Sequence, residues 1–482
     1  MAASETSPYQ VVADMTAEGL ADQRDTHRAP PQDVVPLREA VPVWARIAAL
    51  SFGGPAGQIA VMHRILVDEK KWIGEARFLH ALNYCMLLPG PEAHKLAIYI
   101  GWLLNRTRGG ILAGLLFVLP GLVSVWLLTA AYAFYGHIGA VSAVFFGLKA
   151  AVLAIVLDAV VRIGKRALKS RGLVLLAAAS FTGIFFFALP FPLIILLAGL
   201  LGLAGGKLAP ALFKTGGHGA AGGDGEGLID RRFAQHLPAH VRPSAARLAR
   251  VSLVGAAIWL APLLGLLLWL GPENVLTAVT LFNSKMALVS FGGAYAVLAY
   301  MAQQAVEHYH WLKPGEMLVG LGFAETTPGP LISVVQFVGF MAAFRQPAGL
   351  SPFLAGSLGG LLAMWSTFVP PFLWVFMGGP YMEALIGNKS LNAALSAITA
   401  AVVGVVINLA LWLALHALFG EVDIVRYFGV VLNVPVPGSL NWAAAAITFG
   451  AILAVFVLRL GVLPVLAGAC AAGLAAFAFH LT

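Results

Sequence analysis

Six stretches of the chain, each at least 23 residues long, contain no Asp, Glu, Lys or Arg, and this feature limits the fold more than any other. A membrane-spanning helix needs about 20 consecutive apolar residues. Only 11% of the residues are charged, against about 25% in soluble proteins. The runs do not alternate apolar and polar residues, as the strands of a β-barrel would. The sequence therefore predicts an all-α polytopic membrane protein.

The formal net charge of +8 comes mainly from basic residues in loops and tails. Such residues are typical of the cytoplasmic loops of membrane proteins, so we do not expect nucleic-acid binding. Residues 1–40 are polar and lack the pattern of a signal peptide, so we expect a disordered cytoplasmic tail. Residues 207–247 are rich in glycine and basic residues and predict a cytoplasmic linker. The two cysteines and scattered histidines have no metal-ligand spacing, and we expect no metal or cofactor.

Two Pro-Gly-Pro sequences, at residues 89–91 and 328–330, interrupt apolar segments. Proline removes a backbone donor and breaks a helix, so such a break is unfavourable inside a membrane unless it serves a purpose. Transporters often build their binding sites from discontinuous helices of this kind. The first break is followed by Glu92 and Lys95, and charged side chains inside a membrane indicate function.

The two breaks belong to an internal repeat. Residues 51–91 align with residues 290–330 without a gap, at an offset of 239 residues and with 13 identities. The identities include Ser-Phe-Gly-Gly (51–54 and 290–293), a tryptophan (Trp72 and Trp311) and both Pro-Gly-Pro sequences. Chance matches between apolar segments would not align these landmarks. We therefore expect two homologous halves, at 41–206 and 248–482, on either side of the linker.

The basic loop at 162–171 provides the topological reference, because loops rich in Lys and Arg stay in the cytoplasm. If each Pro-Gly-Pro segment forms one broken crossing, six crossings precede the linker and seven follow it. The result is about 13 transmembrane helices and inverted repeats in a multi-pass protein of the cytoplasmic (inner) membrane.

At these motifs the chain resembles the long-chain, two-domain type of the chromate ion transporter (CHR) family. The resemblance rests on Ser51-Phe52-Gly53-Gly54, on Pro89-Gly90-Pro91-Glu92-Ala93 and on Glu325-Thr326-Thr327-Pro328-Gly329-Pro330. It covers about residues 41–480 and implies export of chromate, a tetrahedral dianion shaped like sulfate. The chain departs from the family at Lys95, where glutamine is usual, and at His94.

The residues themselves are consistent with anion binding. A helix that restarts after a break presents free backbone N–H groups, and its dipole favours negative charge. Basic residues add donors, and glycines let the backbone approach a ligand. Two alternatives to a binding role carry equal weight. The glycines could serve close packing between helices, and the single basic residues Arg46 and Lys285 could extend to the membrane surface. The predicted substrate site comprises Arg46, Ser51, Gly53, Gly54, Pro89, Gly90, Pro91, Lys95, Lys285, Ser290, Gly292, Gly293, Pro328, Gly329, Pro330 and Gln336.

Two acidic residues next to the breaks, Glu92 and Glu325, are predicted to couple or gate transport, because a carboxylate would repel an oxyanion. A capping acid at a helix start is the alternative for Glu92. We expect no enzymatic activity, since neither DDxxD nor HExxH occurs. The predicted partners are the lipid bilayer and chromate or a sulfate-like oxyanion. An uptake carrier for sulfate is the main alternative function, and a homo-oligomer is left open.

Overall fold

The computed structural model of the protein describes residues 34–208, 227–235, 238, 240–291, 294–313, 315–382, 389–427 and 430–480. Within these ranges, six helices are long and apolar enough to cross a membrane. The prediction of a helical polytopic membrane protein is therefore confirmed at this level. Residues 1–33 of the predicted tail, 209–226 of the linker, and Gly292 and Gly293 lie outside the described residues.

The first half consists of helices throughout. In chain order these are α2 (Leu37–Leu50), α3 (Gly54–His63), the π-helical turn η1 (Arg64–Glu69), α4 (Glu75–Leu87), α5 (Glu92–Tyr135), α6 (Gly139–Ala167), α7 (Arg171–Phe187) and α8 (Phe191–Leu208). Helix α2 begins four residues inside the predicted tail. Asp158 and Arg162, four residues apart on α6, form an ion pair at 2.8 Å.

The chain after residue 226 begins with α9 (Leu228–Gln235), in the predicted linker, and α10 (Ala245–Trp269). The helices that follow are α11 (Val275–Val289), α12 (Ala294–Gln303), the π-helical turn η3 (Gln304–His308), α13 (Glu316–Thr326), the 3-10 turn η4 (Leu331–Ser333), α14 (Val334–Arg345), α15 (Pro352–Gly378), η5 (Gly379–Tyr381), α17 (Lys389–Leu418), η6 (Pro437–Ser439), α18 (Trp442–Phe456) and α19 (Val462–Ala478).

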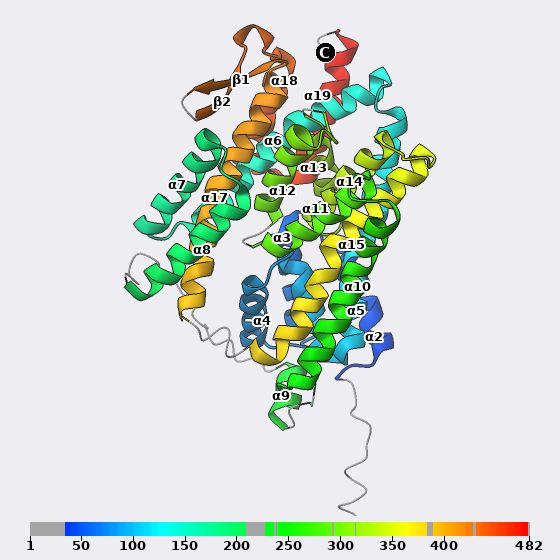
Figure 1. Ribbon diagram of the computed structural model, residues 1–482, viewed down its shortest axis with the longest axis vertical. Helices are drawn as coiled ribbons and strands as arrows, with labels where there is room; N and C mark the ends of the chain where they lie inside the picture. Colours follow the sequence, from blue (N-terminus) through cyan, green and yellow to red (C-terminus); the bar gives the residue numbers. More distant parts are fainter. Residues whose placement is uncertain are drawn as a thin grey trace, which may run out of the picture.

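A β-hairpin between α17 and α18 departs from the all-α prediction. Strand β1 (Val422–Tyr427) pairs antiparallel with β2 (Val430–Pro435), with Val422 opposite Pro435 and Tyr427 opposite Val430. Valine-rich segments of six residues favour strands over helices, and the two strands are separated by only two residues. The hairpin lies at the end of the molecule opposite α9 (Figure 1).

Both Pro-Gly-Pro sequences are the tips of helical hairpins. Across the first break, the rings of Tyr84 in α4 and Tyr99 in α5 lie 5.1 Å apart. A continuous helix would separate these residues by about 22 Å. Across the second break, Phe323 of α13 and Phe337 of α14 lie 5.9 Å apart. We call residues 75–104 the first break hairpin and residues 316–345 the second break hairpin.

Helix α5 itself folds back after the first break hairpin. Asn105 and Arg106 have non-helical backbone angles and divide it into residues 92–104 and 107–135. The two sections run side by side, because a methyl group added at Gly101 would lie 2.5 Å from the carbonyl oxygen of Gly109. Helices α14 and α15 form the same arrangement in the second half, where Gly339 packs against Gly359.

The Ser-Phe-Gly-Gly sequences also follow short helices that turn back. In the second half, Phe282 of α11 and Tyr300 of α12 lie 6.0 Å apart. In the first half, Arg46 of α2 pairs with Glu69 of η1 at 2.6 Å. Figure 1 shows α2 and α4 in the part of the molecule near α9, and α11 to α14 in the part near the β-hairpin.

The prediction that each Pro-Gly-Pro segment is a single broken crossing is therefore wrong. Helices α4 and α13 contain 13 and 11 residues, which is too short to span a bilayer. Each reaches only to its break, and the chain then returns beside it. The predicted count of 13 transmembrane helices assumed that each Pro-Gly-Pro segment crosses the membrane once, so the count loses its basis.

The base of the second break hairpin is closed by an ion pair. Arg345, at the end of α14, contacts both carboxylate oxygens of Glu316, at the start of α13, with N–O distances of 2.7 and 2.8 Å. The hydroxyl of Tyr132 also donates to Glu316, at 2.9 Å. The Glu316 side chain is 7% exposed, so the pair is largely withdrawn from water.

Replacing Arg345 with methionine should lower the free energy of unfolding by about 3 kcal/mol, because it leaves the buried Glu316 carboxylate without its charged partner. Thermal unfolding in detergent, followed by intrinsic fluorescence, measures this loss. The double substitution Glu316→Gln and Arg345→Met should recover part of the stability. A double variant as unstable as the single one would show that the buried charge is not the cause.

Candidate functional site

The two halves meet at their breaks through a reciprocal pair of backbone hydrogen bonds. The N–H of Gly90, in the first break, donates to the carbonyl of Ser290 at 2.9 Å. The N–H of Gly329, in the second break, donates to the carbonyl of Ser51, also at 2.9 Å. The two donors and the two acceptors are each 239 residues apart, so the contact is repeated symmetrically. The two copies of the sequence repeat therefore contact one another through equivalent residues.

Each break also packs against the long helix of the opposite half. Gly90 and Gly329 have φ values of +107° and +119°, a region that side chains disfavour. A methyl group added at Gly329 would lie 3.1 Å from the Cα atom of Gly121, in α5. One added at Gly90 would lie 3.0 Å from Pro371, in α15. These glycines are required for both conformation and close approach.

Two helix starts follow the breaks and lack side-chain caps. Helix α5 begins after Pro91 and the turn η4 begins after Pro330, and neither has a capping side-chain hydrogen bond. Both first turns contain buried residues, with Ala93 and Leu331 each 2% exposed. The first backbone N–H groups of a helix have no partners within it, and they carry partial positive charge. Two buried, uncapped helix starts near one another form an environment suited to an anion.

Lys95 places a buried positive charge in the same hairpin. Its side chain is 1% exposed, and its ammonium group donates to the carbonyl of Leu88, just before the first break. Among the described residues, no carboxylate lies within 4.0 Å of it, and Glu92, three residues earlier, forms no ion pair with it. A buried charge without a counter-ion is unfavourable, so a bound anion would stabilise this arrangement.

Three buried polar side chains near the breaks have atoms without hydrogen-bond partners in the described structure. They are both ring nitrogens of His94, the hydroxyl of Ser333 and the amide oxygen of Gln336. An unpaired buried polar group costs about 1–3 kcal/mol. Gln336 was predicted, but the other two were not. The repeat could have identified these two residues, because His94 and Ser333 occupy equivalent positions, three residues after each break.

The other predicted basic residues lie at the surface. Arg46 is paired with Glu69, and its side chain is 51% exposed. Lys285 of α11 is also exposed. Gly53 and Gly54 have positive φ values and open space where a side chain would be, so they provide a turn between α2 and α3. The breaks thus bring together the Pro-Gly-Pro residues and both serines, and Lys95 contacts Leu88 beside the first break. Gln336 lies further along α14, against Gly360 of α15.

The two predicted coupling acids have different surroundings. Glu325, at the end of α13, is 4% exposed and accepts a hydrogen bond of 2.7 Å from the hydroxyl of Tyr295. Glu92, at the start of α5, is partly exposed and has no ion pair within the described residues. Repeat one has Met86 in the position of Glu325, so the acids make the two halves unequal.

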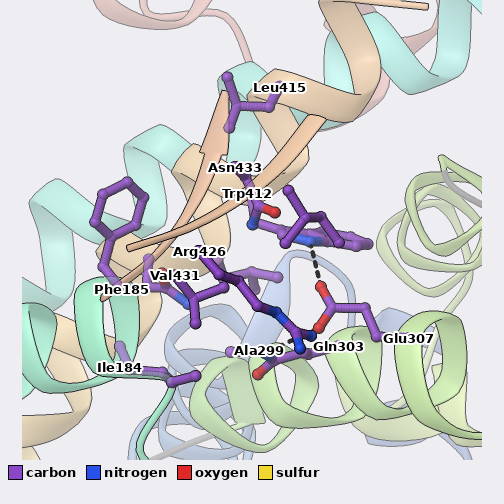
Figure 2. Close-up of a pocket in the computed structure, with 14 residues that line it drawn as sticks. Ile184, Phe185, Ala299, Gln303, Glu307, Trp412, Leu415, Arg426, Val431 and Asn433 are labelled. Atoms are coloured by element: carbon purple, nitrogen blue, oxygen red, sulfur yellow. Dashed lines mark hydrogen bonds between the residues drawn. The ribbon is translucent and has the colours of Figure 1, made fainter. Parts of the chain in front are cut away.

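A cavity of about 160 Å³ lies away from these residues, between α7, α12, α17 and the β-hairpin. Figure 2 shows Glu307 inside it, where the indole of Trp412 and the amide of Gln303 donate to its carboxylate at 3.0 and 3.1 Å. Arg426 of β1 points toward the same group (Figure 2). None of the predicted site residues lines this cavity.

The chain matches the family model described as "Chromate transporter" over residues 39–203 and 277–474. It is 31% identical to the "Chromate transport protein" of Pseudomonas aeruginosa over 362 residues, which cover 74% of this chain and 76% of the relative. It is 27% identical to the "Chromate transport protein" of Cupriavidus metallidurans over 77% of this chain and 79% of the relative. No solved structure matches the chain. The two matched regions correspond to the two halves that meet at the breaks, and the chain belongs to the chromate transporter family.

Proposed function

We propose that the protein is a secondary transporter that exports chromate from the cytoplasm across the inner membrane and so confers chromate resistance. One observation carries this proposal: beside the breaks where the halves exchange hydrogen bonds, two helix starts lack side-chain caps, and the buried Lys95 ammonium group has no ion-pair partner among the described residues. Each of these features favours a negative charge. The names of the curated relatives give the substrate class, and all of those cited are transport proteins.

The proposed site comprises the Pro-Gly-Pro residues of both breaks, Ser51, Ser290, Lys95 and Gln336. We propose that the halves are inverted repeats about this site. Residues 34 and 104, at the ends of α2 and the first break hairpin, are joined by a hydrogen bond of 2.9 Å. Both therefore lie at one end of the first half. The single long helix α10 carries the chain from the region of α9 toward the opposite end before the second half begins (Figure 1).

The membrane potential supplies the driving force in this proposal. Moving one charge across 100 mV is worth about 2.3 kcal/mol, and a dianion leaving an inside-negative cell gains roughly twice that. Export therefore needs no nucleotide.

Chromate accumulation in cells with and without the protein tests the function. Cells that contain it should accumulate less chromate and should grow at higher chromate concentrations. Inside-out vesicles with a clamped potential should take up chromate fastest when the lumen is positive. Unchanged chromate accumulation together with altered sulfate flux would instead support a sulfate carrier.

The two acids near the breaks are proposed to couple or gate transport. Glu92→Gln and Glu325→Gln should each reduce the rate of chromate transport by about tenfold, equivalent to 1.4 kcal/mol, and should leave the concentration for half-maximal transport near that of the wild type. Initial rates in vesicles over a chromate series separate these two parameters. Normal rates in both variants would contradict the coupling role.

A further inference from the structure

His94 has a position that the proposed transport site does not explain. It lies in the first turn of α5, three residues after the break, and is 0% exposed. Its ring centroid is 6.4 Å from that of Phe117 and 5.2 Å from those of Phe368 and Phe372. The last two flank Pro371, which packs on Gly90. The imidazole therefore lies among aromatic rings beside the break.

The backbone carbonyl of Gly114 is within reach of one ring nitrogen of His94, and neither nitrogen has a well-aligned hydrogen bond in the described structure. A neutral imidazole carries one N–H donor and one acceptor nitrogen, and a backbone carbonyl can satisfy only the donor. A fully deprotonated oxyanion has no proton to donate to the acceptor nitrogen. A tetrahedral oxyanion that retains one proton offers an O–H donor. The unused acceptor nitrogen therefore matches a monoprotonated oxyanion.

We infer that His94 is a specificity-determining ligand of the transported anion and that it favours oxyanions that carry a proton near neutral pH. Chromate and phosphate are of this kind, whereas sulfate is the anion of a strong acid and stays fully deprotonated. The aromatic surroundings favour the same choice, because a monoanion is less costly than a dianion to bring among apolar rings. A monoanion gains half the energy given above for the dianion, about 2.3 kcal/mol per 100 mV, so the membrane potential still favours its export. This inference rests on the proposed function and adds the protonation state of the substrate.

The test is competition in vesicles, with chromate transport as the signal and sulfate as the competitor at one fixed pH. His94→Phe fills the aromatic cluster and removes both polar nitrogens. We expect it to raise the chromate concentration for half-maximal transport about tenfold and to leave the sulfate inhibition constant unchanged, so that the preference for chromate falls tenfold. His94→Gln, which retains a donor and an acceptor, should restore most of the preference.

The outcomes separate the two levels of the proposal. An unchanged chromate-to-sulfate preference in a folded His94→Phe protein, or an equal loss for both anions, would overturn the role of His94 and leave chromate transport standing. Absence of oxyanion transport by the wild-type protein would overturn the function itself. Size-exclusion chromatography in detergent establishes that each variant folds, and the glutamine variant distinguishes hydrogen bonding from bulk.

A second, independent observation concerns the linker between the halves. Its helix α9 docks on the loop before α4, with the N–H groups of Leu228 and Ile229 donating to the carbonyls of Lys71 and Trp72, each at 2.9 Å. Asp230 accepts from the backbone N–H of Gly74 at 2.7 Å and pairs with Arg77 at 2.5 Å. The linker thus holds the base of the first break hairpin.

A comparison of the two repeats explains why the linker contacts the base of the first break hairpin. Arg77 and Arg106 are the equivalents of Glu316 and Arg345, the ion pair that closes the second break hairpin. Two arginines repel one another, so the same closure cannot form in the first half. Asp230 supplies the missing negative charge from outside the hairpin. Ile229 and Phe233, which are 0% and 7% exposed, complete the contact.

We propose that α9 is a strap that closes the base of the first break hairpin from outside, in place of the ion pair that the second break hairpin has. Asp230→Asn removes the charge beside Arg77 and should lower the melting temperature in detergent. Arg231→Gln, at an exposed position of the same helix, serves as the control and should leave the melting temperature unchanged. Cysteines at positions 77 and 230 should be joined by a short bifunctional maleimide.

An unchanged melting temperature in Asp230→Asn would overturn the proposal. Failure of the 77–230 pair to cross-link would contradict the docking itself, since Arg77 and Asp230 are in direct contact. The extent of cross-linking is read from a mobility shift after cleavage of a protease site inserted between residues 209 and 226.

Discussion

Gly329→Ala should reduce chromate transport by about tenfold to a hundredfold. A side chain at φ +119° costs about 1–2 kcal/mol, and the added methyl group would press on the Cα atom of Gly121 at 3.1 Å. Both effects push the second break away from α5 and strain the hydrogen bond from Gly329 to Ser51. Each 1.4 kcal/mol corresponds to a factor of ten. Chromate uptake into inside-out vesicles, normalised to protein content, measures the loss.

Matched glycines elsewhere give the control. Gly265 in α10 and Gly468 in α19 have helical backbone angles and no heavy atoms within 4 Å of an added methyl group. Alanine at either position should leave transport at the wild-type level, because alanine is favoured over glycine inside helices. Gly90→Ala should behave like Gly329→Ala, since the contact is reciprocal. Wild-type transport by both break variants would refute the assignment of the breaks to the transport site.

Lys95→Met should abolish most chromate transport without lowering stability. The methionine side chain fills nearly the same volume and removes the buried positive charge. Losing the hydrogen bond to Leu88 costs about 1–3 kcal/mol, but removing a buried charge without a counter-ion releases several kcal/mol. We therefore expect a melting temperature equal to or above that of the wild type and a fall in transport of at least about tenfold.

This combination distinguishes an anion ligand from a structural lysine. If Lys95 only fastened α5 to the end of α4, the methionine variant would melt at a lower temperature and its transport would fall in proportion to the folded fraction. Lys95→Gln provides the conservative comparison, because glutamine is the residue that the family resemblance makes usual there. It retains a donor toward Leu88 and should retain more transport than Lys95→Met.

The membrane class and the repeat were predictable because both are patterns along the chain. Uncharged runs identify spanning helices without any contact information, and the Trp72 and Trp311 landmarks fixed the offset between the halves. The hairpins were not predictable in this way. The segments on the two sides of a break have the same hydropathy whether the chain continues or turns back. Contacts across the break, such as that between Tyr84 and Tyr99, distinguish the two.

The candidate site was predictable only in part, for the same reason. The breaks and Lys95 stand out as unfavourable residues in apolar sequence. Arg46 and Lys285 also stand out, but their exposure and the pairing of Arg46 with Glu69 are consequences of tertiary structure. His94 was visible as a departure from the family, yet its significance depends on three phenylalanines from two helices that surround it.

The reciprocal hydrogen bonds also govern how this protein is made. The ribosome delivers Ser51 to the membrane long before Gly329, and Gly90 long before Ser290. Throughout that interval the first half has a carbonyl and an N–H group at its breaks without their final partners, in a setting where water is scarce. Neither half can complete its own break, so maturation is a single late event that follows insertion of the second Pro-Gly-Pro. A nascent chain released before residue 290 would therefore keep both groups without their final partners, and one released between residues 290 and 329 would keep the Ser51 carbonyl without its partner.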